Sequence, residues 1–146
     1  MPLHTKHSLA HKPMWQLFTT SSTYRKRARL AAALWTLLIL FMCLMPAKEI
    51  PHVKMPLIDK WVHFIFFGGF SFLWLCARPS RRPARLAVIF GISIGFGMLI
   101  ECLQYIFVSL GRSADWLDVL ADSIGALLGI TIFYLFAGIA MKKTHN

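Results

Sequence analysis

Residues 115–140, DWLDVLADSIGALLGITIFYLFAGIA, form an apolar segment that carries three carboxylates in its first half. The segment exceeds the about 20 residues that a helix needs to cross a hydrocarbon core about 30 Å thick. An ionisable group near the centre of such a helix costs about 3 kcal/mol. We therefore expect the polar face of this helix to pack against protein rather than lipid. Spacings of 3, 4, 3 and 4 place the residues of that face in one stripe, formed by Asp115, Asp118, Asp122, Gly125 and Gly129.

The composition of the whole chain is typical of a membrane protein. Of the 146 residues, 57% are hydrophobic and 15% are charged, and the mean hydropathy is +0.59, which is too apolar for an ordinary soluble domain. The long apolar runs lack the period-2 alternation of membrane barrel strands. The sequence therefore predicts an all-α, polytopic membrane protein with a bundle of four transmembrane helices. The expected spans cover about residues 28–45, 61–77, 86–110 and 116–140.

Lysine and arginine predict the orientation of the chain. Twelve of the 16 such residues lie before the first span, between the second and third, or after the fourth. Because cytoplasmic loops carry the excess of positive charge, we expect both termini to be cytoplasmic and the protein to lie in the cytoplasmic (inner) membrane. Basic residues beside spans attract anionic lipid headgroups, so membrane lipids are the expected partners. The net charge of +10 then requires no nucleic-acid partner.

Three regions are expected along the chain. Residues 1–27 are polar and basic, and we expect them to form a flexible cytoplasmic extension. Residues 28–141 would form the four-helix membrane domain. Residues 142–146 would form a short cytoplasmic tail.

Polar residues of the other spans lie toward the same, outer end of the bundle. Asp59 and His63 are four residues apart, and Glu101 and Gln104 are three apart, so each pair shares a helix face. A rise of 1.5 Å per residue puts Glu101 about 14 Å below the outer end of its span. We therefore expect an outward-facing polar pocket. Its candidate residues are Asp59, His63, Glu101, Gln104, Arg112, Asp115, Asp118 and Asp122.

The charged residues near this pocket suggest individual roles. Arg112 is the natural counter-charge for Asp115 or Asp118, because its planar guanidinium can pair with a carboxylate through two hydrogen bonds. Lys60 is expected to extend toward the membrane interface. Asp115 also precedes a helix directly, so we expect it to act as a helix cap.

Other residues favour packing between helices. Gln104 is expected to pack beside Glu101. Two Gly-x-x-x-Gly pairs would allow close helix approach, and they leave a homodimer open. The expected packing glycines are Gly91, Gly95, Gly125 and Gly129.

Three motifs follow one another along the chain. They are Asp59-Lys60-x-x-His63-Phe64, Glu101-x-x-Gln104 and Arg112-x-x-Asp115-x-x-Asp118-x-x-x-Asp122-x-x-Gly125-x-x-x-Gly129. In this order they resemble the VanZ-like membrane proteins, a family named for a protein associated with resistance to the glycopeptide teicoplanin. The resemblance covers about residues 30–140 and implies a small helical envelope protein with an outward polar cluster. The family pattern has Asn where this chain has Asp122, which adds a charge or a protonatable group.

The leading functional hypothesis is recognition of a ligand at the outer leaflet. The pocket would bind a cell-envelope lipid intermediate or a glycopeptide antibiotic and contribute to antibiotic resistance. Arg112 and His63 would reach the polar head, while Trp61 and Trp116 would hold the apolar part. Neither a cofactor nor a bound metal is predicted, and enzymatic activity is left open.

Other readings remain open from the sequence. A membrane enzyme acting on a polyprenyl phosphate or peptidoglycan precursor would use His63 as general acid or base, oriented by Asp59. Glu101 and Asp122 would then hold water or a divalent cation, or, in a transporter, would relay protons or ions. Carboxylates with one histidine also suit a hard cation or zinc, although the spacing identifies no ligand set. Finally, the polar groups can serve simply as hydrogen bonds between helices.

Overall fold

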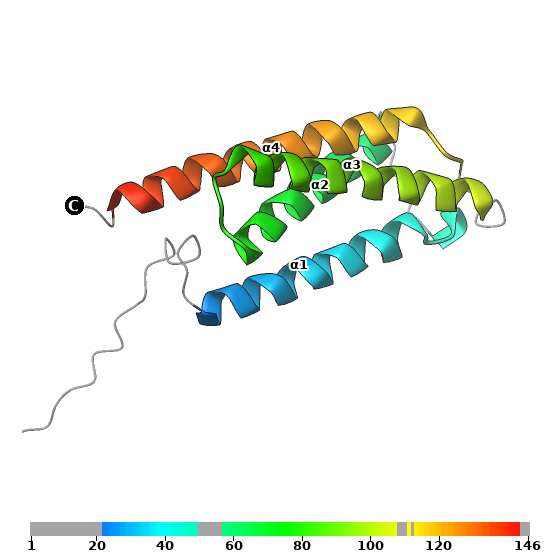
Figure 1. Cartoon of the computed structure of the whole chain (residues 1–146). Helices are drawn as coiled ribbons and strands as arrows, with labels where there is room; N and C mark the ends of the chain where they lie inside the picture. Colours follow the sequence, from blue (N-terminus) through cyan, green and yellow to red (C-terminus); the bar gives the residue numbers. More distant parts are fainter. Residues whose placement is uncertain (1–21, 50–56, 108–110, 112, 144–146) are drawn as a thin grey trace, which may run out of the picture.

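The computed structural model describes residues 22–49, 57–107, 111 and 113–143 (Figure 1). These residues form four α-helices and one short 3₁₀-helix, and they include no strand. The all-α prediction is therefore confirmed for the described part of the chain. The elements are α1 (Ser22–Cys43), η2 (Ala47–Glu49), α2 (Ile58–Ala77), α3 (Pro83–Ile106) and α4 (Trp116–Lys143).

Three of the four α-helices, α2, α3 and α4, are long and apolar enough to cross a membrane. Helix α1 is long enough to cross a membrane, but it is not apolar enough over that length, because basic residues occupy its first turns. These residues are Arg25, Lys26, Arg27 and Arg29. The chain thus has the helices of a membrane protein, and a fourth span through α1 stays a prediction.

Helix α1 begins earlier in the chain than we expected. Residues 22–27, assigned above to a flexible extension, form its first turns. Arginine and lysine are good helix formers, so the helix continues past its apolar part into the basic segment. Residues 1–21 of the expected extension lie outside the described residues. At the other terminus, α4 runs to Lys143 and includes the first two residues of the expected tail.

Helix α2 lies at the centre of the bundle. It packs against α1, α3 and α4, and its contact with α4 is the most extensive. Helix α3 also packs along α4, as the short connection between them predicts. The start of α2, the end of α3 and the start of α4 lie together at one end (Figure 1), which we call the acidic end. The end of α2 and the start of α3 lie at the opposite, basic end, with Arg78, Arg81, Arg82 and Arg85.

Two glycines bring α4 against the backbone of α2. A Cβ added at Gly125 would collide with the carbonyl oxygen of Phe64, and one added at Gly129 would collide with that of Gly68. A larger side chain at either position would therefore separate the two helices. This close contact places the first turns of α4, with their acidic residues, directly beside the first turns of α2.

The glycine pair of α3 lies in a different environment. A Cβ added at Gly91 or Gly95 would meet nothing within 4 Å. The face that α3 buries runs instead through Ser93, Gly97 and Ile100. Gly91 and Gly95 therefore face away from the other described helices, and they do not contribute to packing among the described residues.

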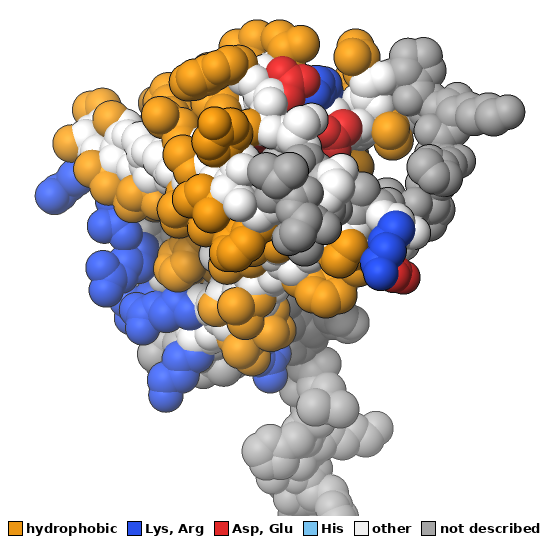
Figure 2. All heavy atoms as spheres, turned by 90° about the vertical axis from the view of Figure 1, so that its right-hand side faces the viewer, with side chains coloured by type: hydrophobic (Ala, Val, Ile, Leu, Met, Phe, Trp, Pro, Cys, Tyr) orange, Lys and Arg blue, Asp and Glu red, His pale blue; other side chains and the backbone are white. Residues whose placement is uncertain are grey.

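Large hydrophobic side chains are exposed on all four α-helices, and hydrophobic side chains cover much of the face seen in Figure 2. Leu37, Ile92 and Phe136, for example, are 60%, 51% and 53% exposed. Large apolar side chains at such exposure would be unfavourable in water over so wide a surface. They are typical of helices that face lipid.

Candidate functional site

Polar side chains from three helices meet at the acidic end. His63 comes from the second turn of α2, Glu101 from the last turns of α3, and Asp118 and Asp122 from the first turns of α4. Each of these four residues is at most 6% exposed. Asp59 lies at the rim, where its side chain is 49% exposed. We call this group, together with Lys60 and Asp115, the acidic cluster.

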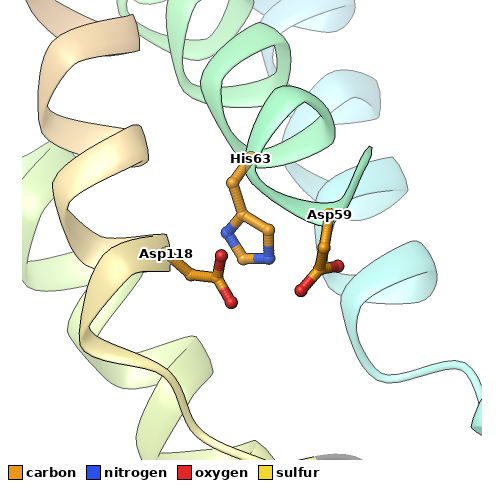
Figure 3. A group of neighbouring side chains, drawn as sticks. All are labelled: Asp59, His63 and Asp118. Atoms are coloured by element: carbon orange, nitrogen blue, oxygen red, sulfur yellow. The ribbon is translucent and has the colours of Figure 1, made fainter. Parts of the chain in front are cut away.

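His63 and Asp122 form a buried pair that joins α2 to α4. His63 Nδ1 lies 3.0 Å from Asp122 Oδ1, within hydrogen-bond distance. The enzyme hypothesis gave the orienting role to Asp59, and the structure gives this bond to Asp122 instead. The reason is the close packing of α4 on α2, which sets both residues at the same depth. Asp59 lies beside the opposite edge of the ring (Figure 3).

Lys60 supplies the positive charge at the centre of the cluster. Its Nζ atom lies 2.5 Å from Asp115 Oδ2 and 2.8 Å from Asp118 Oδ1. We had expected this side chain to extend toward the interface and Arg112 to pair with the acids. Lys60 is instead only 20% exposed, and Arg112 lies outside the described residues. The sequence did hold a signal, because Lys60 precedes His63 by three residues and so shares its helix face.

Asp115 caps helix α4, in line with its position in the sequence. Its Oδ1 atom accepts a hydrogen bond from the Leu117 N–H at 2.9 Å. The hydrogen bond from Lys60 lowers the pKa of the Asp115 carboxyl below its ordinary value, and the bond from Leu117 lowers this pKa further. Asp115 is therefore ionised at neutral pH.

Glu101 joins the end of α3 to the start of α4. Its Oε2 atom accepts a hydrogen bond from the backbone N–H of Asp115 at 2.7 Å. Its other oxygen, Oε1, is buried and has no hydrogen-bond partner among the described residues. Gln104, expected to pack beside Glu101, donates instead to the carbonyl oxygen of Cys43 at 2.9 Å. This bond fixes the end of α1 to α3.

The acidic cluster holds more negative charge than the described cations balance. Asp122 Oδ2 is buried without a hydrogen-bond partner in the described part of the chain, as is Glu101 Oε1. Asp118 Oδ1 meets the Lys60 ammonium without a well-directed hydrogen bond. Buried acceptors that stay unpaired are costly, so the cluster is suited to take up a hydrogen-bond donor, a proton or a cation. The five carboxyl groups, which face one ammonium and one imidazole, belong to Asp59, Glu101, Asp115, Asp118 and Asp122.

A cavity of about 350 Å³ adjoins the cluster between the end of α3 and the start of α4. We call it the lateral groove. Glu101 and Asp115 line it, and its other walls are largely apolar side chains such as Met98 and Val119. Tyr105 and Trp116, which also line it, are 72% and 80% exposed. The groove therefore opens on the side of the bundle.

Comparison with models of known protein families supports the resemblance that the three motifs indicate. The VanZ/LLP1 family model matches residues 3–137. The chain belongs to the VanZ/LLP1 family. This shows the resemblance drawn from the three motifs to be correct. Neither the curated proteins nor the solved structures include a match to the chain.

This VanZ/LLP1-family protein therefore combines two adjoining surfaces of opposite character. The acidic cluster offers buried carboxylate oxygens that accept hydrogen bonds or positive charge. The lateral groove offers apolar walls. Glu101 and Asp115 belong to both surfaces.

Proposed function

We propose that this protein binds an amphiphilic ligand at the outer leaflet, with its polar head at the acidic cluster and its apolar part in the lateral groove. The observation that carries the proposal is the position of Glu101, which lines the groove while one of its buried oxygens has no partner among the described residues. An apolar cavity with a few well-placed polar groups is the usual form of a small-molecule site. The exposed aromatic rings at the groove suit an amphiphile entering from the membrane side.

The charge distribution supports the outward orientation of this site. Arg78, Arg81, Arg82 and Arg85 lie at the basic end, away from the acidic cluster. Because positive residues are retained on the cytoplasmic side, the basic end would face the cytoplasm. The cluster and the groove would then face the cell envelope.

The excess of carboxylates favours a head rich in hydrogen-bond donors. Amines, amides and hydroxyls, which a glycopeptide antibiotic presents, would pair with the unpartnered oxygen of Glu101, which lines the groove. A phosphate head, as in a polyprenyl-phosphate intermediate, would meet several negative groups and one described cation, Lys60. Of the two ligand classes predicted from the sequence, a glycopeptide with an apolar chain is therefore favoured. A contribution to teicoplanin resistance would follow from such binding.

The geometry gives less support to catalysis by His63. This side chain is 2% exposed, and neither it nor Asp122 lines the lateral groove. A general base must come within hydrogen-bond reach of the proton it removes. Binding of a ligand in the groove does not require the ligand to reach His63. The enzyme and transport hypotheses stay predictions.

Binding of teicoplanin to the purified full-length protein in lipid nanodiscs tests the proposal. Val119→Trp would fill the groove, so we expect it to weaken binding at least about tenfold, or roughly 1.4 kcal/mol. Leu120→Trp is the matched control, since Leu120 is the next residue of α4, is 54% exposed and does not line the groove. The control should bind like the unmodified protein.

Three results would count against the proposal. Equal binding by the Val119→Trp and Leu120→Trp variants would remove the groove from the site. Tighter binding of a polyprenyl phosphate than of teicoplanin would reverse the assigned head chemistry. Glu101→Gln that left binding unchanged would show that the carboxylate does not contact the head.

A further inference from the structure

Three side chains of metal-ligand type converge between the first turns of α2 and α4. They are Asp59, His63 and Asp118 (Figure 3), and one ligand atom from each lies within 4.8 Å of the other two. Zinc ligands lie about 2.0–2.2 Å from the metal, so neighbouring ligand atoms are roughly 3.3 Å apart. Binding would therefore draw these side chains closer together, and Asp59, whose side chain is 49% exposed, lies at the rim of the group.

The orientation of His63 is that of a metal ligand. Metal-binding histidines commonly bond their second ring nitrogen to a carboxylate, which fixes the ring and its tautomer. Asp122 Oδ1 lies 3.0 Å from His63 Nδ1 and fills this role. The opposite edge of the ring, which carries Nε2, then lies toward Asp59 (Figure 3).

Buried oxygens without adequate partners provide a separate indication of a cation. Asp118 is 2% exposed, and its Oδ1 atom has no well-directed hydrogen bond. Asp122, which is fully buried, also has an unpartnered oxygen within the described part of the chain, but this atom, Oδ2, lies on the side of Gly97 in α3. A divalent cation beside these carboxylates would reduce the excess negative charge of the cluster.

Two neighbours complete the surroundings of these ligands. Lys60 Nζ lies 2.8 Å from Asp118 Oδ1 and would share this carboxylate with a cation or shift toward Asp115. The Cys43 thiol at the end of α1 lies against the His63 ring. Even with Lys60 and a protonated His63 counted, five carboxylates face two positive groups.

We propose that Asp59, His63 and Asp118 bind one divalent transition-metal cation, with Zn²⁺ the best match to the donors. Imidazole with carboxylates suits zinc, whereas Mg²⁺ and Ca²⁺ prefer oxygen ligands alone. The metal joins α2 to α4, and three protein ligands leave a fourth position for water or for an oxygen of a ligand. This inference does not depend on binding of an amphiphile in the lateral groove.

The test is calorimetric titration of Zn²⁺ into the full-length, EDTA-treated protein, purified without a histidine tag. Every protein in this test keeps His63 and carries alanine at the five other histidines, because these could bind zinc by themselves. They are His4, His7, His11, His52 and His145. We expect one Zn²⁺ per chain and a higher unfolding temperature. X-ray absorption should show one imidazole nitrogen with oxygen neighbours.

Variants then identify the ligands. Asp59→Asn and Asp118→Asn should each weaken zinc binding at least about tenfold. Asp115→Asn is the control, because Asp115 contacts the same lysine but is not one of the three ligands. If Asp118→Asn fails to fold, the rim variant Asp59→Asn still tests whether this group of side chains binds zinc.

Several outcomes would overturn the proposal. They are the absence of stoichiometric zinc binding in the protein that keeps His63 alone of its histidines, unchanged affinity in the Asp59→Asn variant, and a sulfur neighbour in the absorption spectrum. Tighter binding of Mg²⁺ than of Zn²⁺ would also refute it. The zinc titration contains no amphiphile, and the Val119→Trp test contains no added metal, so failure of one proposal is distinguishable from failure of the other.

Discussion

The two ends of the bundle hold their charged residues in different ways. At the acidic end, His63, Asp118 and Asp122 are buried and bonded between helices. At the basic end, Arg81 lies over the ring of Tyr134, 3.8 Å from its centroid, and Arg82 is exposed. Charges at the acidic end therefore hold the helices in register, whereas charges at the basic end lie around a packed apolar core. Mutations at the acidic end should therefore reduce the free energy of unfolding more than mutations at the basic end.

Asp122→Ala should have the largest effect on stability. It leaves His63 buried without its acceptor, and breaking a buried pair by removing one partner costs about 3–5 kcal/mol. Chemical denaturation of the purified protein in detergent measures the loss. Asp122→Asn keeps an acceptor oxygen and should cost much less; equal losses for Ala and Asn would show that the hydrogen bond contributes little.

Lys60→Met should come next. Methionine retains the apolar stem but removes the ammonium that contacts Asp115 and Asp118, and a hydrogen bond to a charged group contributes about 1.5–3 kcal/mol. The same denaturation measurement, extended to the double variant with Asp118→Asn, gives the coupling between the two residues. Additive losses would mean that Lys60 acts independently of Asp118.

Arg81→Ala at the basic end should cost about 1 kcal/mol, because Arg81 is half-buried over the ring of Tyr134 and a cation–π contact contributes about 0.5–2 kcal/mol depending on its burial. Thermal unfolding measures it, with Arg82→Ala as the control because Arg82 is exposed. A loss as large as that of Asp122→Ala would erase the contrast between the two ends.

The smallest effect should be a dependence of stability on acid pH. Because the Lys60 hydrogen bond lowers the pKa of Asp115 in the folded state, this carboxyl contributes stability above its unfolded pKa. That contribution is lost as the pH falls through the lower, folded pKa. Asp115→Asn should reduce the slope of stability against pH in this range. An unchanged slope would assign the acid sensitivity to other carboxyl groups.

Much of the site could be predicted from spacing within single helices. Asp118 and Asp122 are four residues apart, so they share a face, and their cost in lipid required that face to pack against protein. The same reasoning indicated that His63 and Glu101 lie inward. It could not assign bonds between helices, and so it paired His63 with Asp59 and directed Lys60 toward the membrane interface.

The glycine pairs show this limit most directly. Gly91 with Gly95 and Gly125 with Gly129 have the same spacing, and the sequence predicted helix packing for both. Among the residues that the structure describes, only the pair on α4 lies against a neighbouring helix. Spacing defines a face of one helix, while the rotation of that helix against its neighbours depends on all of its contacts together.

The amino-acid sequence alone determined the helical class, the membrane character and the family, because hydropathy, helical spacing and motif order are properties of the chain itself. Tertiary structure decided which groups meet: Asp122 with His63, Lys60 with Asp115 and Asp118, and Glu101 with the start of α4. These contacts depend on the relative depth and rotation of α2, α3 and α4, which side-chain packing sets through many small interactions at once.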